Sequence, residues 1–543
     1  MKKNKSLVRS GLILSLMTFA SRIMGLVREM TKAAFLGTGL YADCFAVAFQ
    51  IPNLLRRLFA ENAISVAFIP TFKGYLEKGD SQENKKETQD FITSTLTLVT
   101  FLTACIVVIG IIITPLLMPI FCKKPVDTSA ANYAEQVQYW LLQKGEITYL
   151  TRLMFPYLLL ISVAAFFQGV LNGCNIFAPS GFTPVLFNGI VILATYILSP
   201  STQNPARAMS IGVVCGGSIQ ALFQWPFIKQ TGWKIRFTSL KKTFTNPGTK
   251  KVVALIVPTI VGIAAYQLND LVSTSMATRA GEGIASSLQY SLRLQELILG
   301  IFAVSIGTVI LPDLSGLANT KKWEEFNQML IQAIKIMIVI SLPVTAYSLV
   351  TGKELISLLY KNKLFDDNSV ALTLGEFRFH ICGLLFIALN RILSPAFYAQ
   401  GNTKLPTLAG IISFATNIIL VLILIKPMSG NGIALALSLA SFINTIFLFI
   451  FMKKMEAIEV KKVIINTIIY ILKILILSVI AAIPCYFLRP VLLSLFENHG
   501  RLIAYGAPVL ILAIIYFTIG VLELIITKDE ITKTILNKLR KSK

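Results

Sequence analysis

Residues 52–63 read Pro52-Asn53-Leu54-Leu55-Arg56-Arg57-Leu58-Phe59-Ala60-Glu61-Asn62-Ala63 and place two arginines and a glutamate inside an apolar stretch. The surrounding residues 43–72 are long enough and apolar enough to cross a membrane. An ionised side chain at the centre of a bilayer costs roughly 2.5–3.5 kcal/mol on insertion scales. A chain that keeps several such charges at this depth is expected to use them, either for an anionic ligand or a water-filled cavity, or to hold helices together.

The composition is that of a membrane protein. Of the 543 residues, 55% are hydrophobic and 14% are charged, and the mean hydropathy is +0.71, whereas soluble domains carry about 25% charged residues. Since about 20 apolar residues make a spanning helix, we expect an all-α polytopic membrane protein with about 14 transmembrane helices. The expected spans are residues 10–36, 43–72, 91–121, 149–173, 184–199, 209–228, 252–277, 285–314, 328–351, 376–400, 405–426, 431–452, 463–488 and 503–527.

Lysine and arginine are distributed unevenly between the connecting segments. If the N-terminus lies inside, the inner segments carry 28 of these residues and the outer loops carry 11. Because positive residues concentrate on the cytoplasmic side of membrane proteins, we expect a multi-pass protein with both termini in the cytoplasm. This distribution accounts for the net charge of +23, so we expect no nucleic-acid partner.

A faint internal repeat relates two of the expected spans, the second and the fourth, to the sixth span after each. Phe59-Ala60 and Ile69-Pro70 in the second span are echoed by Phe302-Ala303 and Leu311-Pro312 in the eighth. Repeated halves with a substrate site at their interface are a common plan among transporters. We therefore expect two six-helix lobes, residues 1–248 and 249–455, followed by a C-terminal helix pair in residues 456–543.

Several arginines lie well inside the expected spans. They are Arg22, Arg28, Arg56, Arg57 and Arg293. At the helical spacings i, i+4 and i, i+3, Arg57 shares a face with Glu61 and Arg293 with Glu296, so structural ion pairs are one interpretation. The other is a multiply anionic substrate such as a pyrophosphate, which the planar guanidinium suits. Central cations outnumber nearby acids, which favours a substrate for Arg22, Arg28, Arg56 and Arg293.

Two other features of the spans carry expectations. Pro52 should kink the second span and free a backbone carbonyl. Lys473 lies near the middle of the thirteenth span, where it faces either another helix or a groove for a lipid tail.

The sequence offers little for catalysis or metal binding. His380 and His499 are far apart, and the seven cysteines form no Cys-x-x-Cys pair. We therefore expect no metal site and no cofactor. A membrane enzyme acting on lipid-linked sugars would need a catalytic acid or histidine near an outer loop, and no such cluster is found, so we expect a transporter and not an enzyme.

The N-terminal motif resembles a known family. The matching residues are Ser21-Arg22-x-x-Gly25-x-x-Arg28, Gly37, Asp43-x-Phe45-x-x-Ala48-Phe49-x-x-Pro52-Asn53-Leu54-Leu55-Arg56-Arg57-x-x-Ala60-Glu61-x-Ala63 and Ala67-Phe68-x-Pro70. A second match is Gly283-Ile284, Leu288, Tyr290 and Arg293-Leu294-x-Glu296. These segments are similar to the MurJ (MviN) lipid II flippases of the MOP exporter superfamily.

The resemblance implies a flippase of the bacterial inner membrane that moves lipid II by alternating access for cell-wall synthesis. Lipid II, the undecaprenyl-pyrophosphate-linked disaccharide pentapeptide, and membrane lipids would be the partners of a monomer. The residues implied to bind substrate are Arg22, Arg28, Arg56, Arg293, Ser21, Asp43 and Glu61. Helices thirteen and fourteen would form the groove for the polyprenyl tail.

The chain departs from the family pattern at a few positions. Glu29 and Ser273 stand where many relatives carry aspartate, and Leu292 where some carry a polar residue. Asp270, one turn before Ser273, is a weak candidate for a cation site. The alternative function is that of a transporter of the same superfamily that exports another polyprenyl-pyrophosphate glycan or drugs.

Overall fold

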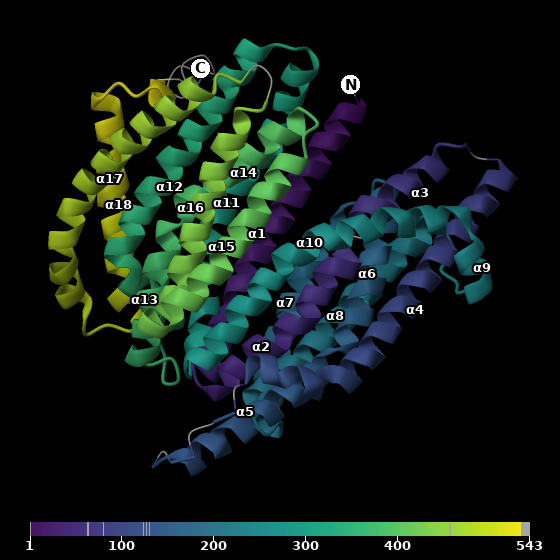
Figure 1. Ribbon diagram of the computed structural model, residues 1–543, viewed down its shortest axis with the longest axis horizontal. Coiled ribbons are helices and arrows are strands. Elements are labelled where there is room, and N and C mark those ends of the chain that lie inside the picture. Colours follow the sequence, from purple (N-terminus) through teal and green to yellow (C-terminus); the bar gives the residue numbers. More distant parts are fainter. Residues whose placement is uncertain are drawn as a thin grey trace. The chain divides into compact units, whose positions relative to one another are not determined.

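The computed structural model describes the backbone of residues 2–61, 64–79, 81–122, 124–125, 128–129, 131–455 and 458–533. It describes the side chains of the same residues except 2–15, 60–61, 257–266 and 301–309. Every regular element in these ranges is a helix (Figure 1). This is the expected solution for a chain in lipid, because a helix satisfies its own backbone polar groups.

The chain forms two compact units, Met1–Ser286 and Ser287–Lys543. The N-terminal unit contains α1 (Lys2–Leu36), α2 (Leu40–Leu55), the π-helices η1 (Arg56–Glu61) and η2 (Ile64–Phe68), α3 (Ile69–Leu76), α4 (Gln82–Phe121), α5 (Tyr133–Met154), α6 (Pro156–Gly173), α7 (Ala178–Leu198), the 3-10 helix η3 (Ser199–Ser201), α8 (Pro205–Gln230), α9 (Leu240–Thr245) and α10 (Pro247–Ala280).

α11 (Ile284–Asn319) begins in the N-terminal unit and continues into the C-terminal one. The other helices of the C-terminal unit are α12 (Trp323–Tyr360), α13 (Asp367–Cys382), α14 (Leu384–Ala399), α15 (Lys404–Met428), α16 (Gly430–Met452), α17 (Val460–Phe496) and α18 (Arg501–Ile526). α10 packs on α2 and α4 of the N-terminal unit. The expected division into two repeated lobes, residues 1–248 and 249–455, stays a prediction.

The expected spans agree with the helices. Each of the 14 stretches coincides with helical structure in the described ranges, and 10 helical segments are long and apolar enough to cross a membrane. The other four stretches include side chains that are not described. The span expected at 149–173 is divided between α5 and α6, where Pro156 begins a new helix, as a residue without an N–H group favours. The protein is therefore an all-helical polytopic membrane protein.

Aromatic side chains fill the core of the N-terminal unit near α3. Phe68 stacks on Phe72 and Phe91 and lies tilted against Phe166, with ring centroids 4.8–5.5 Å apart. α6 approaches closely here because Gly169 has no side chain. A Cβ atom at Gly169 would lie 2.5 Å from Ile64 and 2.9 Å from Phe68, so the aromatic cluster depends on this glycine.

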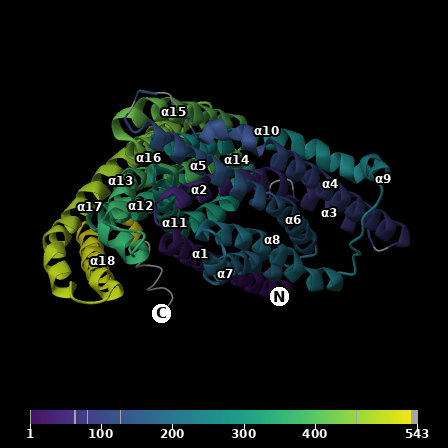
Figure 2. The ribbon, with the colours of Figure 1, turned by 90° about the horizontal axis from the view of Figure 1, so that it is seen from below.

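The C-terminal helix pair packs on one helix of its own unit. α17 and α18 lie side by side in both views (Figures 1 and 2) and both contact α12. At the contact, Tyr347 of α12 lies against Tyr516 of α18 with ring centroids 5.5 Å apart. Arg489 of α17 donates two hydrogen bonds, of 2.7 and 3.0 Å, to the buried Glu354 of α12.

Lys473 forms an ion pair with the carboxylate of a residue that follows the last span. Its Nζ lies 2.5 Å from Asp529 Oδ2, and the Tyr470 hydroxyl donates to Asp529 Oδ1 at 3.0 Å. Asp529 is 2% exposed and follows the last span. Burial acts to raise the pKa of this carboxyl, but the bonds from Lys473, the Ile531 N–H and Tyr470 hold it below its ordinary value. Of the two options left open by the sequence, Lys473 therefore faces another element of the protein.

We predict that Lys473→Met destabilises the protein, because it leaves the buried Asp529 carboxylate without its cation. The loss should be on the order of 2–3 kcal/mol, below that for a fully buried pair since the lysine is partly exposed. Thermal unfolding in detergent measures it, with Lys462→Met, which breaks an exposed pair with Glu459, as control. Because the pKa of Asp529 is depressed, the stability it contributes is present above the ordinary carboxyl pKa and is lost as the pH falls through its folded value. Equal melting temperatures for the two variants would contradict the prediction.

Candidate functional site

Arg28 is held between two helices of the N-terminal unit. Its guanidinium lies 2.7 Å from the carboxylate of Glu29 and donates to Asn188 Oδ1 of α7 at 3.1 Å. The buried Lys32, one turn later, lies 3.6 Å from the same carboxylate. One glutamate therefore serves two cations, and this part of α1 keeps a net positive charge.

Asn188 also ties the earlier part of the motif to α7. Its Nδ2 donates to the backbone carbonyl of Ser21 at 3.4 Å. Arg22, the next residue, is partly exposed and makes no hydrogen bond or ion pair with any residue that the structure describes. Its guanidinium is accordingly available to a ligand.

The helical hydrogen bonding changes character just after Pro52. α2 ends at Leu55, and residues Arg56–Glu61 continue as a π-helix. Such wide turns are rare and occur frequently at functional sites. At the junction, the Nε and Nη2 of Arg56 both donate to Asn53 Oδ1, three residues earlier, at 3.0 and 2.9 Å.

Arg57 contacts two residues of α10. Its Nη1 donates to Gln267 Oε1 at 3.3 Å and lies 3.7 Å from Asp270 Oδ2. The expected pairing of Arg57 with Glu61 stays a prediction. The side chain of Glu61 lies outside the described residues, so its roles stay predictions. Asp270, the weak cation-site candidate, faces a guanidinium, and a positive neighbour opposes cation binding.

Asp43 is fully buried and caps a helix. Its two carboxylate oxygens accept the backbone N–H groups of Gly283 (2.6 Å) and Ser286 (2.8 Å) at the start of α11. In return, Glu282 Oε1 accepts the N–H of Leu40, the first residue of α2. Each carboxylate satisfies donors that a helix start leaves unpaired. In this conformation Asp43 joins two helix ends, and its binding of substrate stays a prediction.

Arg293 belongs to α11 in the C-terminal unit. Its Nη1 lies 2.7 Å from Glu296 Oε2, one turn away, and both side chains are more than 40% exposed. The binding of substrate by Arg293 stays a prediction.

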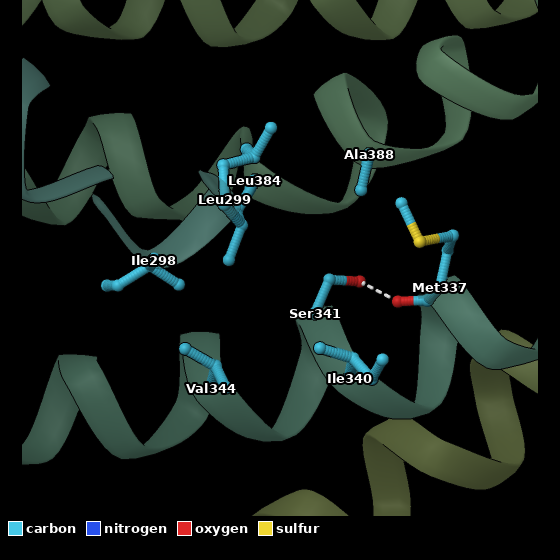
Figure 3. A pocket seen from close by; sticks show the side chains of 8 residues that line it. All are labelled: Ile298, Leu299, Met337, Ile340, Ser341, Val344, Leu384 and Ala388. Carbon is cyan, nitrogen blue, oxygen red and sulfur yellow. Dashed lines mark hydrogen bonds between the residues drawn. The ribbon is translucent and has the colours of Figure 1, made fainter. Parts of the chain in front are cut away.

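The C-terminal unit also contains a small cavity of a different character. It lies between α11, α12 and α14 (Figure 3). Among the described residues, Ser341 is the only polar side chain on its wall, and its hydroxyl donates to the carbonyl of Met337 at 2.7 Å. A cavity lined in this way offers nothing to a phosphate group. The lining residues are Ile298, Leu299, Met337, Ile340, Ser341, Val344, Leu384 and Ala388.

Two partners of the arginines and one further cation were not identified as site residues from the sequence. Asn188 and Gln267 are neutral amides 160 and 210 residues away from the cations they contact. Lys32 was overlooked because it lies near the end of the first expected span, although it is 3% exposed. A buried amide inside a membrane span is a weak signal, but it could have pointed to these positions.

The comparisons with known proteins point to one family, and the matches cover most of the chain. A family model described as "Lipid II flippase MurJ" matches residues 32–498. A Treponema pallidum (strain Nichols) protein named probable lipid II flippase MurJ is 44% identical over 542 residues, which cover 99% of each chain. A Vibrio cholerae protein of the same name is 33% identical over 461 residues, covering 82% of this chain and 83% of the relative.

Solved structures show the same fold. One described as lipid II flippase MurJ in an inward closed conformation gives a TM-score of 0.76 at 24% identity and covers 96% of this chain and 100% of that one. An inward-facing multidrug resistance MATE transporter of the MOP superfamily gives 0.64 at 14% identity, covering 83% and 99%. The family model spans most of the sequence and the Treponema relative aligns end to end, so this chain belongs to the MurJ family of lipid II flippases.

Proposed function

We propose that this protein moves lipid II from the inner to the outer leaflet of the bacterial cytoplasmic membrane, for use in cell-wall synthesis. As a member of its family it is a transporter and not an enzyme. Lipid II would be bound by its pyrophosphate and headgroup and released after the protein opens to the other side. Transport proceeds by alternating access, without a cofactor.

The observation that carries the proposal is the positive charge along α1 and η1. Arg22 is without a protein partner among the described residues, and Arg28 and Lys32 both lie near the carboxylate of Glu29. Arg56 donates to the amide oxygen of Asn53. The planar guanidinium suits bidentate contact with a pyrophosphate. A multiply charged anion is the ligand that best compensates such a set.

The remaining roles follow from the family. Arg293 would also bind pyrophosphate, and Ser21, Asp43 and Glu61 would contact the headgroup. The tail would lie along α17 and α18, whose outer faces carry many exposed apolar side chains, including Ile469, Ile476 and Leu510. We propose a monomer with both termini in the cytoplasm, as the lysine and arginine distribution supports.

We predict that Arg56→Ala abolishes growth of cells that depend on this protein, while the variant still inserts. Loss of a charge-assisted hydrogen bond costs about 1.5–3 kcal/mol, a decrease of at least about tenfold in flipping. Arg56→Lys should also fail, because lysine keeps the charge but loses the planar fork. The measurement is lipid II retained on the inner leaflet, and Arg378→Ala, an exposed arginine of α13, is the control. Normal growth with the alanine variant would contradict the assignment.

We predict that a cysteine at position 21 is reached by a membrane-impermeant thiol reagent in one conformational state and is protected in the other. The seven native cysteines are replaced first. Ser162→Cys, at a buried position of α6, should be protected throughout, and Ser201→Cys, at an exposed position in the expected outer connection between α7 and α8, should react throughout. Protection of position 21 in every condition would show that Ser21 packs between helices and lines no cavity.

We predict that an inside-negative membrane potential drives the cycle. The potential acts on a net charge with about 2.3 kcal/mol per elementary charge per 100 mV, so it draws the empty cationic site toward the cytoplasm, where the anionic headgroup neutralises it. Flipping in vesicles should rise with an imposed potential in the absence of sodium, and Arg22→Gln should weaken this dependence. Transport that requires a sodium gradient and does not depend on the membrane potential would contradict this mechanism. Asp270 would then be the next residue to mutate.

A further inference from the structure

The connection between α8 and α10 is rich in basic residues. From Lys229 to Lys251 there are seven lysines and arginines and no acidic residue. The function proposed above makes no use of this segment. Residues 231–246 nevertheless have a defined structure, held against the side of α4.

Two side chains of α4 fix the backbone of this connection. Gln89 makes a pair of hydrogen bonds with Lys234, accepting its N–H at 2.8 Å and donating to its carbonyl at 2.6 Å. Two turns further along α4, Thr97 Oγ1 accepts the N–H of Thr238 at 3.0 Å. The chain from Lys234 to Thr238 therefore runs along α4 and is held at both ends by hydrogen bonds to it.

The inward side of the segment is apolar. Trp233 packs edge-on against Phe72, with ring centroids 6.3 Å apart, and Ile235 contacts the same hydrophobic cluster. In an extended chain successive side chains point to opposite sides. Lys234 and Arg236 accordingly face outward and are exposed.

The short helix α9 continues the arrangement. Ser239 Oγ caps its start by accepting the Lys242 N–H at 3.3 Å, and Lys242 Nζ lies 2.8 Å from Asp90 of α4. Thr243 is completely buried. The opposite side of α9 carries Leu240 and is open.

Large apolar side chains stand out from this otherwise basic segment. Phe237 is 66% exposed, Leu240 38% and Phe244 50%. Three such residues within eight positions would be unfavourable in water, and a cluster of this kind marks an interaction site. Leu240 and Phe244 are one helical turn apart, so they share a face of α9.

The contacts with α4 indicate how deep the segment from Lys234 to Phe237 lies in the membrane. Gln89 lies next to the expected start of the span at residue 91, and Thr97 is about 12 Å further along the helix. The chain thus runs from the membrane surface at Lys234 toward the hydrocarbon at Phe237, and α9 brings it back to Asp90. Aromatic residues at the hydrocarbon boundary and lysines among the headgroups are the usual arrangement for a segment that lies in a membrane interface.

We propose that residues 231–246 form an interfacial anchor that binds anionic phospholipids of the cytoplasmic leaflet. Lys234, Arg236 and Lys241 contact the phosphate groups. Phe237, Leu240 and Phe244 enter the boundary between headgroups and acyl chains. Charge complementarity selects an anionic lipid surface as the partner, because residues 231–246 carry four cations and no acidic residue.

The first test is titration of detergent-solubilised protein with fluorescent phosphatidylglycerol, and with phosphatidylcholine for comparison. Each basic side chain near an anionic surface is worth about 1 kcal/mol, so the triple variant Lys234→Gln, Arg236→Gln, Lys241→Gln should bind phosphatidylglycerol on the order of a hundredfold more weakly. The matched control removes the same charge elsewhere, through Lys321→Gln, Lys322→Gln and Lys453→Gln, and should stay within about twofold. Equal losses in the two variants, or none in the first, would overturn the proposal.

The second test measures depth and does not depend on the charge variants. In a cysteine-free background, Phe237→Cys and Phe244→Cys are labelled with an environment-sensitive fluorophore in nanodiscs containing phosphatidylglycerol. Lipids brominated on the acyl chain should quench both labels, and aqueous iodide should quench neither, whereas a label at Lys86→Cys should show the reverse. Iodide quenching at positions 237 and 244 would place the segment in water, as a free loop or a protein-docking surface, and would overturn the anchor.

Discussion

A charged side chain inside a membrane must find a polar partner there, and the arrangement of the N-terminal unit depends on how that constraint is met. Arg28 reaches Asn188 on α7, and Arg57 reaches Gln267 on α10. The same two guanidinium groups also lie near carboxylates, Arg28 at 2.7 Å from Glu29 and Arg57 at 3.7 Å from Asp270. Contacts that join the helices therefore also hold the buried charges, and residues 22–32 of α1 still carry three cations and one acid.

The fold could be predicted from the sequence to a large extent, because lipid permits few solutions. Long apolar runs must become helices, and the 14 stretches chosen by hydropathy coincide with helical structure in the ranges that are described. Their boundaries were less certain. Pro156 divides one expected span into two helices, and α4 begins nine residues before the apolar run because its N-cap, Ser81, lies in the polar segment.

The partners of the site residues could not be predicted in the same way. The contact of Arg57 with Asp270 requires knowing that α10 packs beside α2, which no spacing within either helix contains. The π-helical turn that begins at Arg56 was also not predicted. A π-helical turn and a regular α-helix use the same kinds of residue, so the sequence does not distinguish them. Asp43 was expected to face a cavity, but its position beside the start of α11 makes the backbone N–H groups its ligands.

The contact between Lys473 and Asp529 has a consequence for the surrounding bilayer. It places the end of α18 near the fourteenth residue of α17, so the first 13 residues of α17 extend roughly 20 Å beyond that level. This projecting part carries the exposed Ile465, Ile468 and Ile469. α17 as a whole is about 55 Å long, and its apolar stretch at 463–488 is about 39 Å long, which exceeds a hydrocarbon layer of about 30 Å. A helix of this length fits the layer by tilting or by local thickening of the bilayer, so α17 constrains the membrane at this corner of the protein.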